Sequence, residues 1–143
     1  MNDNGLLPGA GLAPPAAAYA HARLTTDARR WLHTSGIVPV APDGSVPESV
    51  ADQAEVVWAN IGVLLAEADM TVTDVVSVTT YVTPGQDLAA VMAARDRALQ
   101  GHLAASTLVV VPELARPAWL LEIAVVAAGR PASESEPEPE PAR

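Results

Sequence analysis

Glu122 is the residue of this chain whose surroundings point most directly to chemistry. It interrupts an apolar run at residues 118–128 that is rich in branched side chains. Such a run fits a strand covered on both faces, where a lone carboxylate is out of place. A buried carboxylate either finds a donor or becomes neutral, and a carboxyl held near neutrality can accept or donate a proton. The alternative is a structural role at an edge or subunit contact, with Arg116 or a backbone amide as partner.

His21 is the second candidate for acid–base chemistry. It lies two residues after Tyr19, so the two side chains share one side of an extended segment. Imidazole titrates near neutral pH, and His21 could act as the acid or base beside Glu122. The alternative is a surface or interface histidine. The three histidines have no carboxylate at metal-ligand spacing, so we expect no metal site.

Several other kinds of chemistry are excluded by absent residues. The chain has no Cys and no Lys, which removes disulfides, thiolate nucleophiles, Cys-ligated zinc and lysine Schiff bases. It also lacks a nucleophile elbow, a phosphate-binding glycine loop and a dinucleotide fingerprint, so we expect no cofactor.

The charge and hydropathy pattern predict where the protein acts. The formal net charge is −9 and the eight basic residues are scattered, which argues against nucleic-acid binding. No apolar run reaches the roughly 18 residues that span a bilayer. The N-terminus lacks the basic segment of a secretory signal. We therefore expect a cytoplasmic protein that contacts neither membranes nor nucleic acid.

The elements that must position these residues can be predicted from periodicity. Apolar residues at helical spacing predict a helix over 48–68, and a second helix over 88–100 begins at Asp87 and ends at Gly101. Strands are predicted over 19–24, 30–35, 75–83, 106–111 and 118–128. The connection between the first two strands is short, which predicts an antiparallel hairpin.

This order of elements predicts an α+β two-layer sandwich, a mixed sheet of about five strands with both helices on one face. The other face would be bare and apolar, with Val75, Val109, Val111 and Val125 on it. A soluble monomer rarely exposes such a face, so we expect it to pack against copies of itself. Residues 1–15 are predicted as a disordered arm, 16–130 as one domain and 131–143 as a disordered acidic Pro/Glu tail.

Together, several segments resemble the Rid (YjgF-like) family of reactive-intermediate deaminases. They are residues 19–22 (Tyr-Ala-His-Ala), 34–40 (Thr-Ser-Gly-Ile-Val-Pro-Val), 50–54 with its Gln, the strand at 75–83, and 121–124 (Leu-Glu-Ile-Ala). The resemblance covers about residues 15–130. It implies a chorismate-mutase-like fold and a homotrimer whose three small-molecule clefts lie between subunits.

The resemblance also implies a reaction and site residues. Better-known members hydrolyse imines and enamines such as 2-aminoacrylate, using a Glu on the last strand to position water and an Arg to grip the substrate carboxylate. Glu122 falls on the Glu position, and Tyr19 and Gly36 match cleft-lining residues.

Three positions depart from the family pattern. Ala105 stands where the Arg is expected, Thr107 where the family usually has Cys, and Met92 where it often has Asn. A charge-assisted hydrogen bond contributes on the order of 1.5 to 3 kcal/mol, and a bidentate one also fixes orientation. The altered cleft suits a neutral or bulkier ligand, so the substrate is expected to carry no carboxylate at that point.

Two functions therefore follow from the sequence. The first is a Rid-like trimeric enzyme that hydrolyses, dehydrates or cyclises a small imine, enamine or related carbonyl-derived intermediate in a specialised biosynthetic or catabolic pathway, using Glu122 with His21 and Tyr19. The second is a non-catalytic trimer that binds a small molecule or docks a partner protein.

Overall fold

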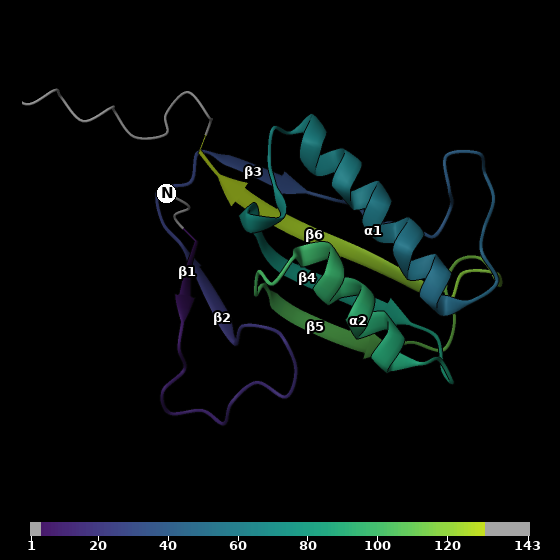
Figure 1. Ribbon diagram of the computed structural model, residues 1–143, viewed down its shortest axis with the longest axis horizontal. Helices are drawn as coiled ribbons and strands as arrows, with labels where there is room; N and C mark the ends of the chain where they lie inside the picture. The colour runs from purple at the N-terminus through teal and green to yellow at the C-terminus, as the bar shows by residue number, and fades with distance from the viewer. Residues whose placement is uncertain (1–3, 131–143) are drawn as a thin grey trace, which may run out of the picture.

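The computed structural model describes residues 4–130, which form two layers (Figure 1). One layer holds the helices α1 (Val50–Glu67) and α2 (Leu88–Leu99). A 3-10 turn, η1, spans Val72–Asp74. The strands are β1 (Asn4–Leu7), β2 (Ala22–Thr25), β3 (Arg30–His33), β4 (Val75–Val82), β5 (Ala105–Val110) and β6 (Leu121–Gly129).

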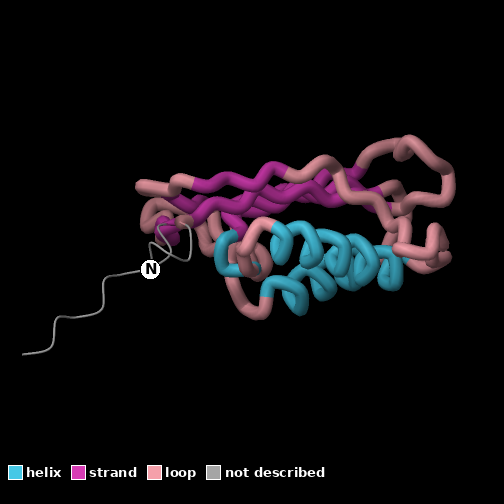
Figure 2. The backbone as a smooth tube through the Cα atoms, turned by 90° about the horizontal axis from the view of Figure 1, so that it is seen from above, coloured by secondary structure: helices cyan, strands magenta, loops and turns pink. Residues whose placement is uncertain are grey.

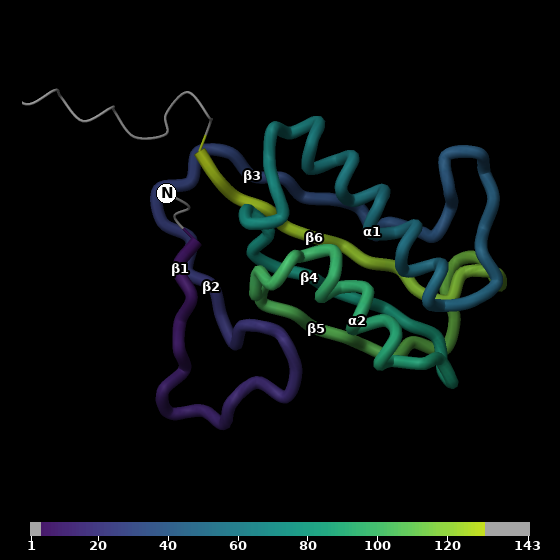
Figure 3. Tube along the Cα trace, viewed as in Figure 1, coloured from purple at the N-terminus to yellow at the C-terminus, as the bar shows by residue number. Residues whose placement is uncertain are grey.

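The main sheet has four strands in the order β3-β6-β4-β5. Strands β4 and β5 are parallel and the other pairs are antiparallel, so the sheet is mixed. A parallel pair needs a crossover, and α2 supplies it. Although β6 comes last in the chain, it runs between β3 and β4 (Figure 3). Both helices cover the same face (Figure 2), which confirms the predicted α+β sandwich.

The core lies between this sheet and the helices. From β6 it receives Leu121, Ile123, Val125 and Ala127, all at most 1% exposed, at alternate positions of the strand. Burying such a side chain contributes roughly 1.5 to 3 kcal/mol for Val, Leu or Ile. Helix α1 begins at Ser49, whose side chain accepts a hydrogen bond from the Asp52 amide. Within one protomer the strand is thus covered by helices on one face only.

The predicted N-terminal hairpin was also wrong. Strand β2 pairs with β1, whereas β3 pairs with the end of β6. Residues 4–7 of the predicted disordered arm form β1, because Asn4 is buried and its amide donates to the Ala128 carbonyl (2.8 Å) and accepts from the Thr25 hydroxyl (2.6 Å). A local pattern cannot reveal such long-range partners. The predicted tail at 131–143 lies outside the described residues.

A register shift between Val75 and Ser77 marks a bulge in β4. Val75 and Val76 are both buried, and strict alternation begins after them. From there, Val78, Thr80 and Val82 face the helices, and the residues between them face the other way.

Candidate functional site

The sheet face away from the helices, here called the open face, carries the candidate chemistry. Cross-strand partners project from the same side of a sheet, so the register assigns this face. Its members are Trp31, His33, Ser77, Thr79, Tyr81, Ala105, Thr107, Val109, Glu122, Ala124 and Val126. Of the four valines predicted here, only Val109 lies on this face. Val75 and Val125 are buried beneath the helices, and Val111 follows the end of β5. The face is therefore more polar than predicted.

Glu122 lies on the open face near the start of β6 and is half-buried. Within residues 4–130 its carboxylate has no hydrogen bond and no ion pair, so neither Arg116 nor a backbone amide is its partner. Gly36 lies directly against it: a Cβ built on Gly36 would be 2.2 Å from Oε1 of Glu122. A side chain at residue 36 would therefore displace the Glu122 carboxylate. The carboxylate thus lies close to the Gly36 backbone, with no polar partner in the described residues.

Hydrogen bonds of Ile37 and Gln53 fix the backbone beside Gly36 and the residues that lead into β6. Ile37, next to Gly36, exchanges backbone hydrogen bonds with Ile123 (2.7 and 3.1 Å). Gln53 of α1 is fully buried, and its Nε2 donates to the carbonyls of Pro47 (2.7 Å) and Ala118 (2.8 Å).

The Oε1 atom of Gln53 accepts from the Leu120 amide (2.8 Å), two residues before Glu122. One helix side chain therefore holds the backbone that leads into the catalytic candidate.

Tyr81 is a site residue that sequence reasoning missed. It pairs directly with Glu122 across the β4–β6 ladder and lies on the same face. The available signal was the alternation within residues 75–82, where Ser77, Thr79 and Tyr81 occupy every second position. That pattern marks one polar face of a strand, but which strand lies beside it is not visible locally.

Tyr19 and His21 lie beside the beginning of β5. Ala20, between them, forms an isolated parallel bridge with Ala105, and its amide donates to the Ala104 carbonyl (3.0 Å). The two rings meet edge to face at 5.9 Å. The Tyr19 hydroxyl accepts from the Ala16 amide (3.3 Å), and Nε2 of His21 lies 2.7 Å from the Ala13 carbonyl oxygen.

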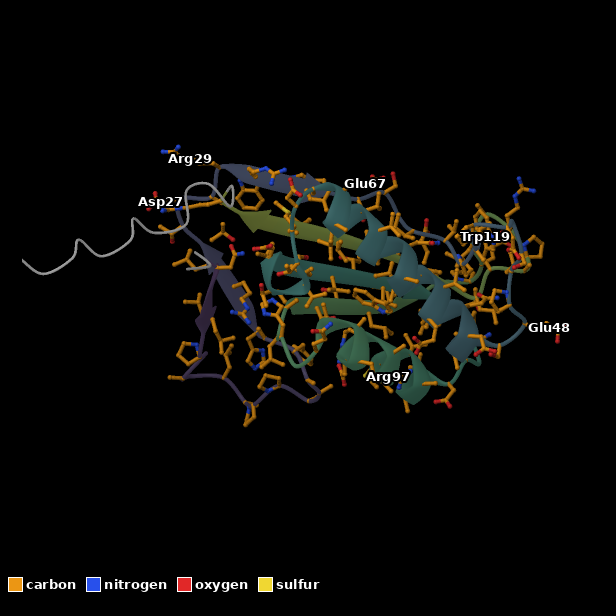
Figure 4. All side chains as sticks on the ribbon, turned by 45° about the horizontal axis from the view of Figure 1, so that its top comes forward. Asp27, Arg29, Glu48, Glu67, Arg97 and Trp119 are labelled. Carbon is orange, nitrogen blue, oxygen red and sulfur yellow. The ribbon has the colours of Figure 1, made fainter. Side chains whose placement is uncertain are left out.

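Within one protomer these residues do not meet Glu122. Ala105 is in register with Ser77, and Glu122 with Tyr81, four residues further along β4. With a rise of about 3.3 Å per residue and a spacing of about 4.8 Å between strands, Ala105 and Glu122 are separated by about 13 Å along the strands and about 10 Å across them. Trp119, three residues before Glu122, lies at the end of the molecule opposite Asp27 (Figure 4).

The two remaining candidates lie elsewhere. Thr107 is exposed on the open face, opposite Thr79. Met92 is half-buried on α2, in the layer behind the sheet (Figure 2), so the structure does not bring it near Glu122.

Arg23 is a cation held near the beginning of β5. Its Nε donates to the Leu103 carbonyl (2.6 Å) and its Nη1 to the Asn4 carbonyl (3.1 Å). Desolvation by burial lowers the pKa of this guanidinium. Two of its donors are committed to backbone oxygens, so Arg23 serves first to join β2 to the strand beside it.

The described residues offer no metal centre and no membrane span. Between residues 4 and 130, no three His, Asp or Glu side chains converge on a point that could hold an ion. No helix in the same range is long and apolar enough to cross a bilayer. Gly36 borders an apolar groove of about 410 Å³ between residues 36–42 and α1, lined by Ile37, Val40, Val63 and Leu64 among others.

Comparison with known proteins gives one consistent match. A family model described as Endoribonuclease L-PSP matches residues 11–129. The mitochondrial protein MMF1 of Saccharomyces cerevisiae is 34% identical over 80 residues, covering 54% of this chain and 53% of that protein. TdcF of Escherichia coli, whose name describes a reactive intermediate deaminase, is 32% identical over 66 residues, covering 46% and 51%. The chain thus spans about half the length of these two relatives.

Solved structures extend the match over most of the chain. YyfB of Yersinia pestis, described as a Rid-family protein of unknown function, superimposes with a TM-score of 0.81 at 28% identity, covering 88% of this chain and 98% of that chain. TdcF, solved with bound serine, gives a TM-score of 0.65 at 25% identity, covering 82% and 89%.

Proposed function

We propose, from the premise that this chain belongs to the family described as Endoribonuclease L-PSP, that it is a homotrimeric enzyme that hydrolyses a small imine or enamine. Within that family, its sequence and fold are those of the Rid (YjgF-like) proteins. The observation that carries the proposal is the Glu122 carboxylate, half-buried against Gly36 and without a partner in its own protomer. An imine carbon is already electrophilic, so the protein needs to hold the substrate, orient a water and manage protons. In this proposal Glu122 accepts a proton from that water.

The composition of the open face supports assembly of the protein with copies of itself. Trp31 is 51% exposed and Val109 is 39% exposed there, although both are large and apolar. Packing this face against neighbouring protomers would cover them. In such an assembly, the Tyr19 and His21 end of one protomer approaches Glu122 of the next and completes a cleft that a single chain lacks.

Ala105 and Thr107 on the open face support the proposed substrate class. Neither of them is charged, and Arg23 has two donors engaged by carbonyls. We therefore expect an imine without a carboxylate at that point. A cytoplasmic location stays a prediction, and MMF1 of yeast is mitochondrial.

The family description also mentions an endoribonuclease. Cleaving RNA requires a surface that binds phosphates, and the formal net charge of −9 opposes one. For this chain, small-molecule hydrolysis is the better-supported activity.

The test compares a neutral imine with an anionic one. Amine oxidase generates the first from benzylamine, and amino acid oxidase generates the second from leucine. The expected result is faster decay of the neutral imine with wild-type protein, and a rate lower by about 10²-fold or more for Glu122→Gln.

Ala105→Arg should shift the preference toward the anionic imine by about 10- to 100-fold, as one charge-assisted hydrogen bond would. If wild type accelerates neither imine, nor the decay of 2-aminoacrylate, the hydrolytic proposal is refuted and a binding trimer replaces it.

A further inference from the structure

The Tyr81 hydroxyl is the polar group in direct register with Glu122. The two residues oppose each other in the antiparallel β4–β6 ladder, and directly opposed residues hold their Cβ atoms about 5 Å apart on one face. Both side chains are half-buried. Neither the phenol nor the carboxylate has a hydrogen-bond partner within residues 4–130. The two Cβ atoms are therefore close, and both end groups are uncommitted. The Glu122 carboxylate lies toward Gly36, on the other side of β6 from Tyr81, which leaves space between the two groups for a small ligand.

The surroundings of Tyr81 differ on its two sides. Val109 lies opposite it on β5, and Glu122 lies opposite it on β6. A tyrosine on an apolar sheet face often serves only to anchor an interface. Here one flank is apolar and the other is a carboxylate without a donor. A proton donor and a proton acceptor therefore stand on neighbouring strands of one sheet face.

The two side chains also differ in length. Glu122 lies low, against the Gly36 backbone, whereas a tyrosine carries its oxygen further from the sheet. A small planar C=N group above Glu122 could then meet a water on the carboxylate side and the phenol at its nitrogen. Glu122 alone offers only an acceptor when ionised, so a second group must supply the proton that the nitrogen needs.

We propose that Tyr81 is a catalytic residue that protonates the imine nitrogen while Glu122 deprotonates the attacking water; this inference rests on the proposed function. In the first step, the water oxygen bonds to the imine carbon and Glu122 takes one water proton. The C=N π electrons move to nitrogen, which takes the Tyr81 proton, and a carbinolamine forms.

In the second step, Glu122 returns its proton to the nitrogen and the C–N bond breaks. Ammonia leaves with the bonding pair, and the phenolate of Tyr81 takes the carbinolamine O–H proton as the C=O bond forms. Both side chains end in their starting states, and the sum is imine plus water giving carbonyl plus ammonia.

The test is Tyr81→Phe, which removes a single oxygen and keeps the ring. With the benzylamine-derived imine, kcat should fall about 10²-fold while KM changes less than about threefold, because the lost group acts only in the transition state. Thr80→Val is the matched control. It removes a hydroxyl from the next residue, which is buried beneath the helices, and should leave kcat unchanged. Thermal unfolding of both variants checks the fold.

The double variant Tyr81→Phe with Glu122→Gln adds a second readout. Groups that act in one step are not additive, so the double variant should be no more than about threefold slower than the slower single variant. An unchanged kcat in Tyr81→Phe, or a raised KM at constant kcat, would overturn the proton-donor role while wild-type hydrolysis stands. Absence of wild-type hydrolysis is a different result, seen before any variant is made, and overturns the proposed function together with this inference.

Discussion

Gly36→Ala tests the contact on which the site depends. The φ angle of Gly36 does not lie in the left-handed region, so alanine suits the backbone there. Its Cβ would lie 2.2 Å from Oε1, 2.5 Å from Cδ and 2.8 Å from Cγ of Glu122. Ordinary contacts begin near 3.4 Å, so the carboxylate must move by about 1.2 Å. A displacement of about 1 Å in a positioned catalytic group costs about 10²-fold in rate.

The expected result of Gly36→Ala is therefore a kcat about 10²-fold lower on the neutral imine. The free energy of unfolding should fall by about 1 to 3 kcal/mol, as for other overpacked sites. Steady-state kinetics and urea unfolding measure the two effects. Gly62→Ala is the matched control: a Cβ there meets nothing within 4 Å, and the residue lies in α1. Gly62→Ala should raise the free energy of unfolding by about 0.5 to 1 kcal/mol and leave kcat unchanged.

A double-variant cycle separates this contact from other effects of the added methyl group. In a Glu122→Ala background the three atoms nearest to the methyl group of Gly36→Ala are absent, so its cost in stability should disappear. The reasoning is refuted if Gly36→Ala keeps wild-type kcat, or if its destabilisation persists after Glu122 is truncated.

Two further predictions concern the scaffold and the assembly. Gln53→Leu leaves the carbonyls of Pro47 and Ala118 and the amide of Leu120 without their partner. We therefore expect the free energy of unfolding, measured with urea, to fall by about 3 to 5 kcal/mol. A fall below about 1 kcal/mol would mean that water replaces the Gln53 side chain. Val109→Asp should convert the proposed trimer into monomers in sedimentation velocity, whereas Val63→Asp, at a residue of α1 that is 58% exposed, should not. Equal behaviour of the two variants would contradict assembly through the open face.

The helices and the central strands were predictable because their signals are local. The Asp87 cap and the apolar spacing of residues 50–65 predict α2 and α1 to within two or three residues at each end. Strand partners were not predictable in this way. The pairing of β1 with β2 depends on Asn4 reaching Ala128, a contact that spans most of the described chain.

The candidate site was predicted in part for the same reason. Glu122 was identifiable because a charge within an apolar run is unusual, and Gly36 was identifiable from the family resemblance. Tyr81 was not, since its importance comes from the strand that lies beside it. The bare face was predicted correctly as a feature, and Val109 lies on it. Val75 and Val125 were assigned to the wrong face, because the bulge in β4 and the strand that pairs with β6 are not visible in the local sequence.

That bulge has a consequence for how this protein can vary. Beyond Val76, each residue's inside or outside position depends on the one extra residue that the bulge accommodates. Removing it would exchange the two sides of the strand as far as Val82, turning the phenol inward and sending valines out to solvent. An insertion or deletion at the bulge would therefore exchange the buried and exposed sides of every following residue of the strand at once. A substitution at the same position changes one side chain only.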